Sequence, residues 1–121
     1  MPEGDRFMKF EVATDTGLTI LRLKGERLDA HNSDALKIKI KEIFEGGGKT
    51  VLVNLGEVRF IDSSGLGALV SGFKNAVFYK GRLALSSLQE QVRSMFDLTR
   101  LNRVFDIYVS EEEALSALSG K

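Results

Sequence analysis

One short run of the sequence, Val51-Leu52-Val53-Asn54-Leu55, is almost continuously apolar and stands between two segments with helical spacing. Such a run is typical of a central strand that is covered on both faces of its sheet. The segment before it has a stripe of Leu36, Ile40 and Phe44, and the segment after it extends from about 63 to 79. A helix between two strands returns the chain so that the second strand runs parallel to the first. The sequence therefore predicts an α/β fold.

The flanking segments extend this pattern to a whole domain. Residues 7–12 and 18–24 alternate like strands around a turn at 15–17, which predicts a hairpin. Further strands are expected at 83–85 and 104–109, a helix around 88–96, and a last helix after the capping box Ser110-Glu111-Glu112-Glu113. We predict one domain over residues 1–121, with a flexible tail at 1–6. Its sheet is mixed and largely parallel, with roughly four or five strands packed against about four helices.

Side-chain spacing also predicts which positions face the core. In the hairpin the inner side is expected to carry Met8, Phe10 and Val12. In the helix at 63–79 the inward residues are expected to be Leu66, Leu69, Val70, Phe73 and Val77. Residues 36–41 also alternate like a strand, but we favour a helix, because the stripe continues to Phe44 and ends at three glycines. That choice leaves Ile38 exposed.

Composition excludes several classes of protein. The chain has no cysteine and one histidine, so a disulfide framework, thiol catalysis and a zinc site lack their ligands. Asp29 and His31 are two ligands without a third, and no metal or cofactor is expected. Seventeen basic residues balance seventeen acidic ones, so nothing indicates nucleic acid or an anionic membrane as a partner. There is no membrane-spanning run and no secretion signal, and we expect a cytoplasmic protein.

The unusual segment is Phe60-Ile61-Asp62-Ser63-Ser64-Gly65-Leu66-Gly67, where two apolar residues lead into a small polar turn that begins a helix. A helix cap explains one such polar residue. It does not explain two adjacent hydroxyls, a carboxylate and two glycines, because each glycine costs a helix roughly 1 kcal/mol. The turn therefore has a further role, at a place where free backbone N–H groups point outward.

The helix that follows the turn has a face of small residues, Ser64, Gly67, Ala68, Ser71, Gly72 and Asn75. Such a face lets another protein approach closely. It could equally let a neighbouring element of the same domain pack tightly, and spacing alone does not separate these alternatives.

Known catalytic motifs do not fit the turn. A hydrolase elbow reads G-x-S-x-G, with glycine two places before the serine. The residue at that position is Ile61 for Ser63 and Asp62 for Ser64, so neither serine fits the motif. The run Gly46-Gly47-Gly48-Lys49-Thr50 precedes a strand instead of following one, so it is a helix stop and not a phosphate-binding loop.

The Asp62-Ser63-Ser64-Gly65-Leu66-Gly67 block resembles the STAS domain, specifically the bacterial anti-sigma factor antagonists. The resemblance also includes Leu21-Arg22-Leu23-Lys24-Gly25, Leu28-Asp29-Ala30, 51–55 and 104–108. It implies a small α/β domain without catalysis of its own, in which Ser63 is the phosphoacceptor and Ser64 the lesser candidate. It implies that the unphosphorylated domain binds an anti-sigma factor, a serine kinase with bound nucleotide, and thereby frees a sigma factor. Phosphorylation breaks this complex and a serine phosphatase restores it.

The resemblance assigns further residues to the switch and its surface. Asp62, Ser64 and Gly65 form the switch turn, and the partner-binding residues are Ser64, Gly67, Ala68, Ser71 and Asp29. An alternative from the same family is an accessory subunit of a membrane lipid-transport complex that docks by this helix without phosphorylation. Two departures from the family pattern concern partner identity: Arg100 stands where glycine is common, and 25–29 is one residue longer than usual.

Overall fold

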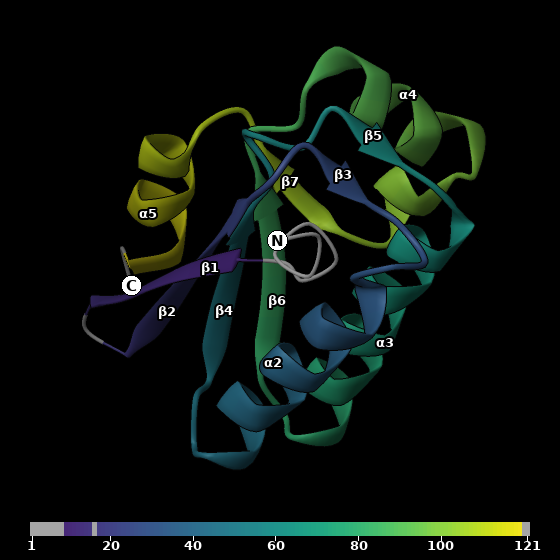
Figure 1. Cartoon of the computed structure of the whole chain (residues 1–121). Helices are drawn as coiled ribbons and strands as arrows, with labels where there is room; N and C mark the ends of the chain where they lie inside the picture. Colours follow the sequence, from purple (N-terminus) through teal and green to yellow (C-terminus); the bar gives the residue numbers. More distant parts are fainter. Residues whose placement is uncertain (1–8, 16, 120–121) are drawn as a thin grey trace.

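The computed structural model of the chain describes residues 9–15 and 17–119. Five strands form the main sheet: β1 (Lys9–Asp15), β2 (Leu18–Lys24), β4 (Thr50–Asn54), β6 (Arg82–Ser86) and β7 (Asp106–Tyr108). They lie in the order β1-β2-β4-β6-β7 (Figure 1). The hairpin β1–β2 is antiparallel and the later pairs are parallel, so the predicted α/β fold with a mixed sheet is confirmed.

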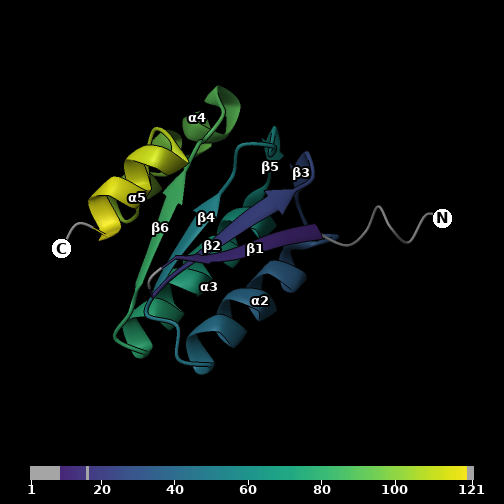
Figure 2. The same cartoon turned by 90° about the vertical axis from the view of Figure 1, so that its left-hand side faces the viewer.

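Helices cover both faces of this sheet. They are α2 (Ser33–Glu45), α3 (Ser63–Phe78), α4 (Glu90–Leu98) and α5 (Glu111–Ser119), with a short 3-10 turn η1 at Leu101–Arg103. Figure 2 shows α5 on one side of the sheet and α2 and α3 on the other. The parallel strands are added in one direction, β2-β4-β6-β7, so the right-handed crossovers place α2, α3 and α4 on one face, while α5 follows the last strand and covers the opposite face.

Burial on two faces explains the apolar run that opened the sequence analysis. Val51 and Val53 point into the larger core with α2, α3 and α4. Leu52 points to the other face, into a smaller core that contains Ala114 of α5. All three strand residues are fully buried. A central strand with an exposed face would need polar residues at alternate positions, so the run indicates the two-sided covering.

A second, smaller sheet was not predicted. β3 (Arg27–Leu28) pairs in parallel with β5 (Phe60–Ile61), and the carbonyl of Glu26 accepts hydrogen bonds from the amides of Arg59 and Phe60 at 2.7 and 3.0 Å. Two-residue strands are too short to show a period of two, which is why the sequence gives no signal for them. The segment 25–29, which is one residue longer than the family pattern, contains β3 and so supplies one strand of this small sheet.

Several predicted details need correction. Two side chains that were predicted to face the core are exposed. Val77, near the end of α3, is 63% exposed, and Val12, on the edge strand β1, is 46% exposed. The last strand is shorter than predicted, since η1 and the exposed Val104 precede it. Ile38 is exposed as expected. The predicted inward position of Met8 and the tail at 1–6 lie outside the described residues.

A network of charged side chains holds α5 against the ends of the strands. The Arg22 guanidinium donates to both carboxylate oxygens of Glu111 at 2.8 Å, and Asn54 donates to the same carboxylate at 2.7 Å. The Arg22 hydrogen bonds hold the pKa of Glu111 below its ordinary value, against the opposing effect of partial burial. One half of the predicted capping box is present, since the Glu113 amide donates to Ser110 Oγ at 3.0 Å. The Glu113 carboxylate reaches back one residue further than in a capping box and accepts from the Val109 amide instead of the Ser110 amide.

In the part of the chain that the structure describes, no helix is both long and apolar enough to cross a membrane.

The first prediction concerns Glu111. A carboxylate whose folded-state pKa is lowered stabilises the fold above its unfolded-state pKa and loses that contribution as the pH falls through the folded-state value. Glu111→Gln should therefore lower the free energy of unfolding by about 1–2 kcal/mol at pH 7, with a difference that shrinks as the pH falls below 4.5 and vanishes below the folded-state pKa. Urea denaturation of both proteins across this range measures it. The neighbouring exposed Glu112→Gln is the control, and an equal loss for both variants would contradict the role of Arg22.

The second prediction concerns Arg100, which follows the last turn of α4 with a φ of 62°. This left-handed conformation costs a side chain with a Cβ roughly 1–2 kcal/mol, a cost that glycine avoids. Arg100→Gly should raise the free energy of unfolding by about 0.5–1 kcal/mol after the entropy of glycine is subtracted. Thermal denaturation should show this gain for Arg100→Gly and none for Arg103→Gly, whose φ is not positive. Equal effects of the two glycines would overturn the explanation.

Candidate functional site

The polar turn between β5 and α3 has the geometry of a capped helix start. Asp62 is the N-cap residue in an extended conformation, and its carboxylate accepts a hydrogen bond from the Gly65 amide at 3.0 Å. Ser63 is the first residue of α3 and is exposed, whereas Ser64 is half-buried. The Ser63 hydroxyl therefore lies outside the core at the positive end of a 16-residue helix.

Gly65 is required by the close approach of α3 to β3. A Cβ at this position would lie 2.5 Å from the Leu28 carbonyl oxygen and 2.8 Å from Ile61 Cγ1. No rotamer relieves a contact with a backbone atom, so only glycine lets the first turn of the helix lie against the small sheet. This requirement explains one of the two glycines that the capping function leaves unexplained.

The small sheet also brings Asp29 to the edge that carries Ser63. Arg27 and Leu28 are in register with Phe60 and Ile61, and the Asp62 amide donates to the Leu28 carbonyl at 3.3 Å. Asp29 and Asp62 thus follow directly on neighbouring parallel strands. The sequence analysis placed both residues at the site, and only the β3–β5 pairing brings them together.

The Asp29 carboxylate is already engaged within the chain. It accepts from the His31 amide at 3.0 Å and from Arg27 Nε at 3.2 Å, and its side chain is 15% exposed. Burial alone would raise the pKa of Asp29, but the His31 amide and the Arg27 guanidinium outweigh it and hold that pKa below its ordinary value. Asp29 therefore remains charged near neutral pH, and it orders the turn that enters α2.

The small-residue face of α3 divides into two parts. Gly67 is exposed, and a Cβ there would meet nothing within 4 Å. Ser64 and Ser71 are half-buried. Gly72 faces inward instead, since its Cβ would lie 2.9 Å from Ile40 Cδ1 of α2. The spacing of the small residues allowed either contact with another protein or packing inside the domain. Packing inside the domain explains the small residue at position 72 but not the one at position 67.

Ala68 was predicted to contact a partner, and the structure contradicts this. Its side chain is 1% exposed and belongs to the larger core. A methyl group fits the tight contact between α2 and α3 as well as it fits an outer surface, so small size alone did not distinguish the two faces.

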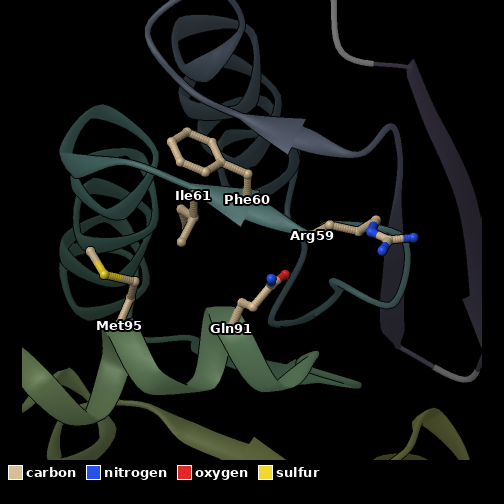
Figure 3. A pocket seen from close by; sticks show the side chains of 5 residues that line it. All are labelled: Arg59, Phe60, Ile61, Gln91 and Met95. Carbon is tan, nitrogen blue, oxygen red and sulfur yellow. The ribbon is translucent and has the colours of Figure 1, made fainter.

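A groove beside the turn was missed by the sequence analysis. Arg59, Phe60, Ile61, Gln91 and Met95 line it, between β5 and α4 (Figure 3). The Arg27 guanidinium carbon lies 4.2 Å from the centre of the Phe60 ring, which is a cation–π contact. The only signal in the sequence was an aromatic residue two places before the polar turn, and α4 is required to complete the groove.

Over residues 9–15 and 17–119, no group of three or more His, Asp or Glu side chains is placed to hold a metal ion.

The contrast between Gly65 and Gly67 gives a prediction about stability. Gly65→Ala should lower the free energy of unfolding by about 1–3 kcal/mol, because its Cβ meets the Leu28 carbonyl. Gly67→Ala, at the open position of the same helix turn, should raise that free energy by up to about 1 kcal/mol through helix propensity. Urea denaturation of the two variants tests this. Destabilisation by Gly67→Ala as large as that by Gly65→Ala would show that the close approach is not the cause.

Comparison with known proteins agrees with this geometry. The STAS domain family model matches residues 9–114. The anti-sigma F factor antagonist of Paenibacillus polymyxa is 30% identical over 112 residues, which cover 92% of this chain and 95% of that protein. An anti-sigma factor antagonist (STAS) domain protein from Planctomyces limnophilus is similar in fold, with a TM-score of 0.83 at 24% identity, over 91% of this chain and 97% of that one.

A third similar structure is the Bacillus cell fate determinant SpoIIAA in its phosphorylated form. It has a TM-score of 0.71 and 26% identity, and the match covers 91% of this chain and 99% of the other. With the family model and the 30% identical relative, these matches extend over nearly the whole described chain. The chain therefore belongs to the STAS domain family, in the branch of the anti-sigma factor antagonists.

Proposed function

We propose that this chain is an anti-sigma factor antagonist that is switched by phosphorylation of Ser63. Unphosphorylated, it binds an anti-sigma factor that is a serine kinase with bound nucleotide, and so releases a sigma factor. The kinase then transfers a phosphoryl group to Ser63, and a serine phosphatase removes it. The observation that carries this proposal is the exposed Ser63 directly after an Asp62 cap at the start of α3. A relative with 26% identity known in a phosphorylated form supports it.

A phosphate on Ser63 is compatible with the fold. It adds about −1.5 to −2 charges, and the start of a helix offers free amides and a positive dipole to such a group. Asp62 already uses its carboxylate to accept from the Gly65 amide, so the phosphate does not have to replace the cap. We therefore expect the phosphorylated domain to keep its structure.

The same phosphate would weaken binding by repulsion. With a partner carboxylate at about 4–5 Å and an effective dielectric constant near 20, each pair of like charges costs roughly 3–4 kcal/mol. This corresponds to a loss of affinity on the order of 10²- to 10³-fold. The neighbouring Asp62 and Asp29 add to the negative charge at this edge. No rearrangement of the domain is needed for such a switch.

The contact surface that we propose surrounds Ser63 on the outer side of α3. It contains Ser64, Gly67 and Ser71, which are half-buried or exposed. The absence of a side chain at Gly67 lets the partner approach the helix backbone closely. Asp62 and Gly65 shape the turn, and in this proposal Asp62 also polarises the Ser63 hydroxyl for the kinase.

Variants of Ser63 test the proposal. Ser63→Ala should retain the anti-sigma kinase in the presence of ATP, whereas Ser63→Asp should bind it with at least ten-fold lower affinity, since the mimic carries less charge than a phosphate. Both should melt like the parent. Binding by calorimetry and intact mass after incubation with kinase and ATP are the measurements. Ser116→Asp, at an exposed position of α5, is the matched control.

The outcomes separate the alternatives within the family. A parent chain that gains one phosphate while Ser63→Ala gains none supports the proposal. If Ser63→Asp binds as tightly as Ser116→Asp, the electrostatic switch is wrong. A chain that gains no phosphate with a kinase it binds would instead favour an accessory subunit of a transport complex.

A further inference from the structure

We propose that the groove between β5 and α4 binds an extended segment of the partner in which an apolar side chain is flanked by acidic residues. That the segment belongs to the anti-sigma factor rests on the function proposed above. The groove has a volume of about 430 Å³ and is open to solvent along its length. It begins at Arg59 and Phe60, directly before the turn that carries Ser63 (Figure 3).

The groove offers an apolar contact that the fold itself does not use fully. Phe60 is 42% exposed although it is aromatic, and its ring lies on the side of β5 away from α4, whereas the buried Ile61 points toward α4 (Figure 3). From the other side, Met95 of α4 is half-buried and points toward β5 (Figure 3). Leu98 continues the same face of α4 at helical spacing and is 79% exposed. Exposed aromatic and methionine side chains are enriched where proteins bind one another, because methionine adapts its shape to the ligand.

The charge of the groove specifies an acidic ligand. Arg59 is the one ionisable residue that lines it, and the Arg59 side chain makes no hydrogen bond or ion pair within residues 9–15 and 17–119. Two of the nearby carboxylates have other partners, since Asp29 accepts from Arg27 and Glu57 lies 2.8 Å from Lys24 Nζ. A guanidinium can donate two parallel hydrogen bonds to a carboxylate, so Arg59 is suited to an acidic side chain from outside.

Gln91 adds hydrogen-bonding capacity on the opposite wall. Its side chain extends from α4 toward β5 (Figure 3), and the amide can donate to and accept from the backbone of an extended segment. An apolar anchor between polar groups is the arrangement by which proteins fix both the position and the direction of a bound segment.

The groove lies next to the phosphorylation site. Arg59 and Ser63 are four residues apart along an extended stretch that includes β5 and Asp62, so their Cα atoms are at most about 13 Å apart. In this proposal the groove anchors the partner, while the phosphate acts at the start of α3.

The test uses the methyl group of Met95 as the reporter. The chain has three methionines, so methionine-labelled protein gives few signals, and Met95→Leu assigns the one in the groove. The probe is a six-residue peptide of alternating glutamate and leucine, and its matched control replaces each glutamate by lysine. The Met95 signal should shift and saturate with the acidic peptide, with at least five-fold weaker binding of the lysine peptide.

Charge reversal gives the second arm. Arg59→Glu should weaken the acidic peptide roughly ten-fold, and Lys49→Glu, at the opposite end of the sheet, should leave binding within about two-fold. An unshifted Met95 signal, equal binding of both peptides, or an Arg59→Glu variant that binds like the parent would each overturn the groove assignment. None of these outcomes depends on a kinase, so failure of the groove and failure of the Ser63 switch are distinguishable.

Discussion

Burial of the central strand β4 on both faces is the constraint on which the rest of the structure depends. With Val51 and Val53 on one side and Leu52 on the other, helices must cover the sheet twice. The connecting helices α2, α3 and α4 cover one face because each returns the chain to a parallel strand, and this leaves the other face to α5. The parallel strands then end at one edge, near which the chain carries its polar turns and exposed groups.

The turn before α3 combines a rigid backbone with an exposed hydroxyl. Gly65 lets the helix lie against β3, and Asp62 satisfies the Gly65 amide. Both contacts hold Ser63 at a fixed place without covering it. In the proposed switch, a charge added there would meet a favourable helix end within the domain and an unfavourable neighbour in a complex, so the fold and the binding would respond differently to the same modification.

The proposed binding surface joins two kinds of contact. The outer side of α3 around Gly67 allows a close approach of the backbone, and the groove beside β5 offers Phe60, Met95 and an Arg59 without a partner among the described residues. In this proposal the outer side of α3 selects a partner by shape, and the groove selects it by charge. Because the groove residues lie outside the capped turn, substitutions in the groove would alter the proposed partner contact without removing the Asp62 cap.

Periodicity and motif chemistry in the sequence determined the α/β class, the bounds of the longer elements and the position of Ser63 at a helix start, since these depend on neighbours along the chain. Only the tertiary structure decided that Ala68 and Gly72 face the core while Gly67 faces outward, because small residues fit either environment. It also decided the meeting of Asp29 with Asp62 and the groove between β5 and α4. These depend on two-residue strands and on contacts between distant segments, for which a single sequence has no periodic signal.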